Sequence, residues 1–470
     1  MLFNSIDYAL FLPIVFILYW ILPPKIRWML LLVSSYYFYM CWNAKYVFLI
    51  ATTTIVSYAC AIAIEKTADT KRKKAALITA LFVSLGILFV FKYFNFAMAT
   101  LSNIISVKPV YLNFLLPVGI SFYTFQTLGY VADVYKGKVK AEKNLLKYAT
   151  FVSFFPQLVA GPIERTANLL PQIKNDKSFN YSAAWEGLIL ITWGLYKKLV
   201  IADNLAIWVD KVYGNLSNYQ GCSLLLATFF FTVQIYCDFS GYTDIARGSA
   251  KLFNIELMEN FKSPYFATGF KDFWSRWHIS LSTWFKDYVY IPLGGNRVPK
   301  IRHAFNLLIT FLVSGLWHGA NWTFVIWGGI HGMGLLCENY FVKRKNNSFR
   351  LVRALVTFLL VMLAWIFFRS SNIRDAIYVF GHMFSGLANI KLYFISGLKI
   401  LNISFLTIVK LSFVYFLPLV MYDYISLKKD IIKSLGDQSV LLRSAVIVFM
   451  TFLILIFGHV GQSSFVYFQF

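Results

Sequence analysis

Long apolar runs recur along almost the whole chain. Residues 75–94 form one such run, interrupted only by Lys92 near its end. Residues 351–368 contain a single charge, Arg353, and residues 445–460 form a third run. A helix needs about 20 mostly apolar residues to cross a bilayer. The runs lack the alternation of barrel strands, and only helices or closed barrels satisfy their backbone in lipid, so the pattern predicts transmembrane helices.

The same pattern places the expected membrane segments. Thirteen runs are predicted, near residues 7–22, 28–42, 46–64, 75–96, 112–134, 145–161, 184–200, 221–237, 303–319, 321–341, 351–369, 404–424 and 440–459. Several of these are short, so some segments are expected to be tilted or re-entrant. The predicted fold class is all-α, a polytopic transmembrane bundle with interfacial and re-entrant helices.

Composition supports the membrane-protein class and argues against binding to nucleic acid. Hydrophobic residues make up 59% of the 470 residues and charged residues only 14%, against about 45–50% and 25% in soluble domains. The net charge is +23, from 44 basic and 21 acidic residues. In a soluble protein this would suggest nucleic acid. The basic residues instead collect in short loops between apolar runs, at 71–74, 136–147 and 343–353, so no nucleic-acid partner is expected and membrane lipid surrounds the chain.

The basic loops also predict topology. The loops at 23–27 and 71–74 are separated by two runs, which places both on one side, the cytoplasm. The N-terminus is then outside, and its first run is expected to be retained because no cleavage site follows it. The basic residues at 428–433 and Arg443 precede the last run, so the C-terminus is also expected outside. Two outside ends require an even number of crossings, so at least one of the thirteen runs does not cross.

The cysteines carry no recognisable chemistry. They are Cys41, Cys60, Cys222, Cys237 and Cys337. Their spacing includes no C-x-x-C pair, so it predicts neither a disulfide framework nor a metal site. They are expected to be small buried apolar residues.

Two of the six histidines stand out. His278 lies in the least apolar stretch, 251–302, where charge and aromatic residues alternate as in interfacial helices. His318 lies between the apolar runs 305–316 and 322–330, where an ionisable group is costly and usually faces a bundle interior or cavity. A neutral imidazole can take a proton near pH 7, which suits acyl transfer. On position alone, either residue could instead be a packed histidine that hydrogen-bonds between helices. The remaining four are expected at loops or span ends (His303, His382) or in helix packing (His331, His459).

The motifs around these histidines resemble a known family. Residues 273–282 read FWSRWHISLS and residues 317–322 read WHGANW. They resemble the membrane-bound O-acyltransferase (MBOAT) family, in particular its alginate and peptidoglycan O-acetyltransferase branch. Further matching segments are 116–126, 155–163, 236–246, 288–297 and 465–470. Each alone is weak, but together they follow the family's order along residues 1–470, which implies a single MBOAT membrane domain with about 11–13 membrane segments around a tunnel.

The resemblance assigns roles to residues. It implies that His318 is catalytic and that His278 either shares the catalysis or shapes the tunnel. Residues expected to line the tunnel or bind substrate are Trp317, Asn321, Trp322, Arg276, Asp238 and Tyr242. Two local alternatives stay open: Arg276 either holds phosphates of a coenzyme A donor or pairs with Asp272, four residues earlier. Likewise, an Asp244–Arg247 pair at helical spacing is as good an explanation of that segment as an acceptor path.

The resemblance also implies an activity. The expected enzyme is an O-acetyltransferase of the bacterial cytoplasmic (inner) membrane, with no bound cofactor or metal and with acetyl-CoA or another acetyl donor as co-substrate. An extracytoplasmic or membrane-anchored acetyltransferase is the expected partner, and the acceptor is peptidoglycan, alginate or another surface polysaccharide. Lysine (31) outnumbers arginine (13), which hints at an AT-rich genome and favours peptidoglycan slightly. Two alternatives remain: D-alanyl transfer to teichoic acid from a carrier protein, and a transporter or flippase, which would need paired membrane carboxylates or inverted repeats.

Overall fold

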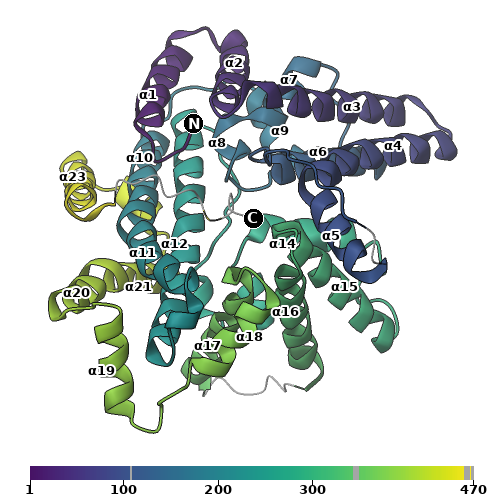
Figure 1. Cartoon of the computed structure of the whole chain (residues 1–470). Helices are drawn as coiled ribbons and strands as arrows, with labels where there is room; N and C mark the ends of the chain where they lie inside the picture. Colours follow the sequence, from purple (N-terminus) through teal and green to yellow (C-terminus); the bar gives the residue numbers. More distant parts are fainter. Residues whose placement is uncertain (106–107, 342–348, 460–465, 467–470) are drawn as a thin grey trace. The chain divides into compact units, whose positions relative to one another are not determined.

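The computed structural model describes residues 1–105, 108–341, 349–459 and 466, and these residues contain helices and no strand (Figure 1). The α-helices are α1 (Ile6–Ile21), α2 (Arg27–Met40), α3 (Val47–Lys66), α4 (Thr70–Leu88), α5 (Phe94–Ile105), α6 (Ile120–Tyr135), α7 (Leu145–Ser153), α8 (Phe155–Leu158), α9 (Thr166–Lys174), α10 (Tyr181–Leu195), α11 (Asp203–Tyr213), α12 (Cys222–Leu252), α13 (Phe270–Trp274), α14 (Ile279–Phe285), α15 (Lys300–His318), α16 (Trp322–Phe341), α17 (Arg350–Arg369), α18 (Ile373–His382), α19 (Ile390–Ile400), α20 (Phe405–Lys410), α21 (Leu417–Ser426), α22 (Ile431–Gly436) and α23 (Val440–Phe457). Short 3-10 turns are η1 (Pro24–Ile26), η2 (Ala44–Tyr46), η5 (Leu216–Asn218) and η6 (Pro264–Phe266). Segments η3 (Phe89–Tyr93), η4 (Tyr196–Ala202), η7 (Lys286–Tyr290) and η9 (Leu411–Phe416) are π-helical.

Six helical segments are long and apolar enough to cross a membrane, among the residues that the structure describes. They are Ala44–Lys66, Thr70–Ile105, Cys222–Leu252, Arg350–Arg369, Phe405–Ser426 and Val440–Phe457. The predicted class, an all-α polytopic membrane protein, is confirmed. The other predicted runs form shorter or more polar helices, of which α1 is one. The predicted 11–13 segments, the tunnel and the re-entrant segments stay predictions.

Two predicted spans differ from the observed helices for a local reason. The run at 112–134 becomes helical only at Ile120, because Gly119 adopts a left-handed backbone with φ of 75°. The run at 145–161 is broken into α7 and α8. Phe154 leaves helical geometry between them, with ψ of 109°, and Pro156 then occupies the first turn of α8.

The chain divides into two compact units. The first comprises Met1–Ile191 and Tyr242–Glu259, and the second comprises Thr192–Gly241 and Asn260–Phe470. Of the predicted motif at 465–470, only residue 466 is described. Most of the basic loop at 343–353 also lies outside the described residues.

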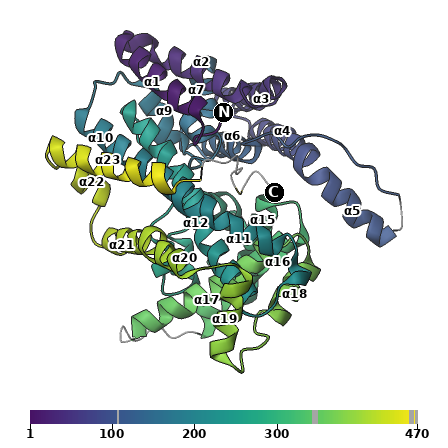
Figure 2. The same ribbon diagram turned by 60° about the vertical axis from the view of Figure 1, so that its left-hand side comes forward.

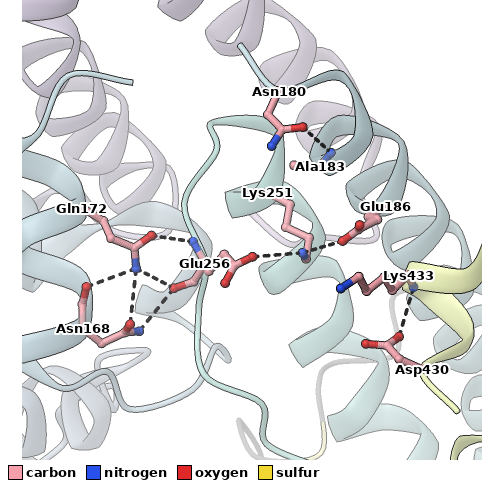
Figure 3. A network of polar contacts seen from close by, with 9 residues as sticks. All are labelled: Asn168, Gln172, Asn180, Ala183, Glu186, Lys251, Glu256, Asp430 and Lys433. Carbon is pink, nitrogen blue, oxygen red and sulfur yellow. Dashed lines mark hydrogen bonds and ion pairs between the residues drawn. The ribbon is translucent and has the colours of Figure 1, made fainter. Parts of the chain in front are cut away.

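The first unit is built around α6, which is buried along almost its whole length. Helices α3 and α4 pack on α6 and on each other, and α7 packs on α2, α3 and α9. Polar contacts tie the stretch after α12 to this unit (Figure 3). Lys251 pairs with Glu186 at 2.7 Å and with Glu256 at 3.6 Å, and the backbone N–H of Glu256 donates to Gln172. The beginning of the predicted interfacial stretch is therefore held by side chains of α9 and α10.

In the second unit, α15 and α16 form an extensive helix pair (Figures 1 and 2). Helix α16 also packs on α13 and α17. Glycines let the pair approach closely. A Cβ on Gly315 would lie 2.2 Å from the Phe324 carbonyl oxygen, and one on Gly328 would lie 2.2 Å from that of Phe311. Small residues at such crossings are typical of membrane helix pairs. The close crossing brings α16 side chains onto the end of α15.

Candidate active site

The turn between α15 and α16 places His318. His318 is the last residue of α15, and Gly319 leaves the helix in an extended conformation. A side chain at Gly319 would collide with the ring of Phe324, since its Cβ would lie 2.2 Å from ring carbon Cε2. Asn321 then starts α16: its Oδ1 accepts the Thr323 N–H at 3.1 Å, and its Nδ2 donates to the Ser371 carbonyl at 2.8 Å. The small residue after His318 is thus required by the tight reversal of the chain.

His318 sits in an aromatic enclosure and is only 2% exposed. Its ring centroid lies 5.1 Å from that of Trp317, 5.0 Å from that of Trp327 and 5.6 Å from that of Phe368. All three rings are steeply inclined to the imidazole, at 67–88°. The enclosure therefore restricts both the orientation of the imidazole and its access to water.

His278 lies between α13 and α14 in a strained backbone conformation. It caps α14 with φ of 42° and ψ of 54°, the left-handed region that non-glycine residues rarely adopt. The side chain is fully buried, and its ring packs at 4.6 Å against Phe239 of α12. Residues held in such conformations cluster at functional sites. This observation favours a functional His278 over a merely packed one.

The structure brings the two histidines together from elements 40 positions apart in the chain. Their ring centroids are 6.3 Å apart, with the ring planes at 60°. Burial lowers the pKa of His278 to about 3, so this imidazole is neutral at pH 7. A neutral imidazole is the form that can accept a proton from an attacking hydroxyl.

Asn260 defines which nitrogen of His278 carries the proton. The Ser280 backbone N–H can only donate, so the amide atom 3.1 Å from it must be Oδ1 of Asn260. The same Oδ1 accepts the Ser280 hydroxyl at 2.7 Å and lies 3.3 Å from Nδ1 of His278. Next to this acceptor, Nδ1 carries the proton, so the lone pair of the neutral ring is on Nε2. Asn260 was missed by sequence reasoning, since no spacing rule links it to a histidine 18 positions later.

Of the other predicted site residues in this region, Trp317 lies beside the histidines, with its ring centroid 6.0 Å from that of His278. Arg276 pairs with Asp272 at 2.7 Å, so the local alternative for Arg276 is realised. Asn321 caps α16, as described above. Trp322 is 47% exposed. Arg276 and Asn321 therefore make polar contacts of their own, Arg276 with Asp272 and Asn321 with Thr323 and Ser371.

Asp238 belongs to a buried ion cluster in the second unit. Lys198 of η4 lies 2.6 Å from Asp238 and 2.8 Å from Asp203, and all three side chains are almost completely buried. The backbone N–H of Val466 donates to the other Asp238 oxygen at 2.7 Å. A lysine within the apolar run 184–200 was a signal that sequence reasoning did not use, because buried charges in membrane proteins are expected to be paired.

Tyr242 belongs to the first unit. Its hydroxyl donates to Oδ1 of Asn4 at 3.0 Å. In the same unit, Asp244 lies 3.7 Å from Arg247, which is the pair that helical spacing predicted as the local alternative. The hydroxyl and these charged groups thus make structural contacts within their own unit.

A cavity of about 980 Å³ lies in the second unit, and its lining contains chain neighbours of His278 and His318 but not the two histidines themselves. Its lining includes Ile279, which follows His278, and Ser314, one helical turn before His318. Cationic and titratable side chains also line it: Lys271, Lys286, Arg297 and His303. The cavity therefore combines a basic wall with residues that lie near both histidines along their helices. Within the described part of the chain, no three His, Cys, Asp or Glu side chains gather as metal ligands.

A helical membrane protein with two neighbouring buried imidazoles and a large basic cavity has the parts of a membrane acyltransferase. The model of the MBOAT, membrane-bound O-acyltransferase family matches residues 138–373, which contain both histidines, and the chain belongs to this family. The predicted family and enzyme class are confirmed. The roles of single residues stay predictions.

Three relatives indicate the branch. The chain is 40% identical over 392 residues to the Probable alginate O-acetylase AlgI of Pseudomonas syringae pv. tomato, covering 82% of this chain and 75% of that protein. It is 37% identical over 421 residues to the Peptidoglycan O-acetyltransferase of Helicobacter pylori, covering 82% and 80%. It is 30% identical over 246 residues to the Teichoic acid D-alanyltransferase of Bacillus subtilis, covering 48% and 60%.

Proposed function

We propose that this acyltransferase works in the bacterial cytoplasmic membrane and supplies acetyl groups for O-acetylation of a cell-surface polysaccharide. The observation that carries the proposal is the pair of buried histidines, whose ring centroids are 6.3 Å apart, together with a basic cavity lined by their chain neighbours Ile279 and Ser314. The names of the relatives that match over 82% of the chain support an acetyl group and a polysaccharide. Peptidoglycan is slightly favoured as the acceptor, and alginate or another exopolysaccharide is the other choice.

His318 acts as the general base in this proposal. Its imidazole takes the proton of an acceptor hydroxyl while the hydroxyl oxygen attacks the acyl carbon of the donor thioester. The new C–O ester bond forms, the C–S bond breaks, and the proton passes from the imidazolium to the leaving thiolate. In His278, the contact of Nδ1 with Asn260 leaves the lone pair on Nε2, on the side of the ring away from Asn260. His278 and His318 both pack on Trp317. Positioned general bases contribute about 10²–10⁴-fold in rate.

The donor occupies the basic cavity. Coenzyme A carries phosphates at one end and a thioester at the other, and Lys271, Lys286 and Arg297 offer cations for the phosphates. The thioester end would then lie toward Ile279 and Ser314, close to the histidines. Arg276 contributes less to phosphate binding because Asp272 already neutralises its charge. Acetyl-CoA or a donor with a similar phosphorylated thiol fits this arrangement.

The acetyl group leaves toward the outer face, where a second protein accepts it. The motivation is the composition: 59% of the residues are hydrophobic and only 14% are charged, which leaves little polar surface to hold a long polysaccharide. An extracytoplasmic or membrane-anchored acetyltransferase would complete the transfer. The acceptor hydroxyl that His318 deprotonates then belongs either to a relay group or to that partner.

D-alanyl transfer is the second candidate, because a teichoic acid D-alanyltransferase matches 48% of the chain. Deleting the gene and releasing esters from wall, exopolysaccharide and teichoic acid with mild alkali separates the two. Mass spectrometry should show acetate lost from one polysaccharide, D-alanine unchanged, and acetate restored by the wild-type gene. Loss of D-alanine esters with unchanged acetate would overturn the proposal and establish the alternative.

A further inference from the structure

A second, smaller pocket lies in the first unit, and no residue of the proposed acetyl-transfer site lines it. It measures about 150 Å³ and lies between the ends of α1 and α9 and the beginnings of α2 and α7. Five basic side chains line it: Lys25, Arg27, Lys147, Lys174 and Lys177. Asp176 is the one acidic residue in the lining. A single water needs only about 10–15 Å³ of such space, so a phosphate group fits easily.

Most of this positive charge is not neutralised by the protein. Lys174 pairs with Glu142 at 2.7 Å. Within the described ranges, Lys25, Lys147 and Lys177 form no ion pair. Burial lowers the pKa of Lys177, because partial removal of the ammonium from water disfavours its charged form. An anion in the pocket would offset that cost.

Arg27 has a different role from the lysines, because its contacts hold the walls of the pocket together. Its Nε donates to the Leu22 carbonyl at 3.0 Å and its Nη1 donates to the Lys177 carbonyl at 2.6 Å. Its guanidinium also lies over the rings of Tyr19 and Trp20, at 5.2 and 4.7 Å. The contacts join the end of α1 to the segment after α9, so the cations are presented from a defined frame.

The surroundings indicate that the anion is attached to a lipid. Two of the helices that line the pocket, α1 and α2, also carry exposed apolar side chains on their other faces: Ile14, Ile17, Ile21, Met29 and Val33. Tyr19 and Trp28 line the pocket itself, and Lys147 lies 5.6 Å above the ring of Trp28. Aromatic residues with basic side chains mark the level of lipid headgroups. The loop at 23–27 is predicted on the cytoplasmic side, where anionic lipids and basic pockets between membrane helices meet.

We infer that this pocket binds the phosphate headgroup of an anionic phospholipid of the cytoplasmic leaflet. Phosphatidylglycerol is the simplest probe of this chemistry. The site shares no residue with the proposed acetyl-transfer site, so the two proposals are tested independently of each other.

The test uses the full chain in detergent and native mass spectrometry with phosphatidylglycerol or phosphatidylcholine. The pocket variant carries Lys25→Gln, Lys147→Gln and Lys177→Gln. The matched control carries Lys71→Gln, Lys73→Gln and Lys74→Gln, the same charge change in the basic stretch at the start of α4. Thermal denaturation in phosphatidylcholine alone should be equal for all three proteins, which shows that the variants fold.

The wild type and the control should retain one phosphatidylglycerol tightly, and neither should retain phosphatidylcholine. In the pocket variant this affinity should fall roughly 100-fold, because each lysine beside an anionic lipid is worth about fivefold. Equal losses in both variants would mean diffuse surface attraction and would overturn the site. Displacement of the lipid by millimolar inorganic phosphate would show a free-anion site and also contradict the inference.

Discussion

Alanine at Gly328 should disturb the crossing of α15 and α16 and, through it, the environment of His318. The added Cβ would lie 2.2 Å from the carbonyl oxygen of Phe311, 3.0 Å from its carbonyl carbon and 3.2 Å from the Cα of Gly315. All three are backbone atoms, so no rotamer change relieves the clash and the helices must separate by about 1 Å. Overpacking of this kind costs about 1–3 kcal/mol.

The displacement reaches the proposed site because Trp327, the neighbour of Gly328, packs at 5.0 Å on the ring of His318. We expect Gly328→Ala to lower the thermal denaturation midpoint and to reduce acetyl release from isolated envelope, normalised to the amount of protein in the membrane. The matched control is Gly329→Ala on the same helix, where the new Cβ meets only the Leu312 side chain at 3.4 Å. Wild-type stability and activity in Gly328→Ala, or an equal loss in Gly329→Ala, would refute this reasoning.

Three further outcomes are expected. A reporter active only in the cytoplasm, fused after Phe470, should give no signal, because the basic loops predict that the C-terminus lies outside; a strong signal would contradict this topology. The purified protein in liposomes should not acetylate polymer until an extracytoplasmic acetyltransferase is added, and efficient acetylation by the single protein would remove the relay. Burial raises the pKa of Glu164 to about 7 from its ordinary value of 4.5, so its ionisation destabilises the folded state. The wild-type thermal midpoint should therefore fall as the pH rises from about 4.5 to about 7, whereas a Glu164→Gln variant that kept the same fall would show that another group causes it.

The fold class was predictable because the length and continuity of apolar runs report directly on the membrane. The ends of the helices were less predictable from the sequence. The left-handed Gly119 delays α6, and the break at Phe154 divides a run that hydrophobicity alone joins. Such backbone changes depend on one or two residues and leave the average hydrophobicity almost unchanged.

The candidate site was predictable in part. Polarity within apolar surroundings and the motif resemblance pointed to His278 and His318, but only the three-dimensional structure places their rings 6.3 Å apart. The pair between Arg276 and Asp272 followed from spacing along one helix. The contacts of Asn260 with His278 and of Lys198 with Asp238 join segments far apart in the chain, and no local pattern encodes them.

The catalytic role of His318 is the central claim, and two substitutions test it directly. His318→Gln keeps a polar side chain that can hydrogen-bond but cannot accept and release a proton near pH 7, whereas His318→Ala removes the ring altogether. The measurement is acetyl released by mild alkali from isolated envelope, divided by the amount of the variant in the membrane. Both variants should accumulate normally and lose about 10²–10⁴-fold in transfer rate. Near-wild-type release from His318→Gln, with a low protein level for His318→Ala, would contradict the account and leave His318 as a packing residue.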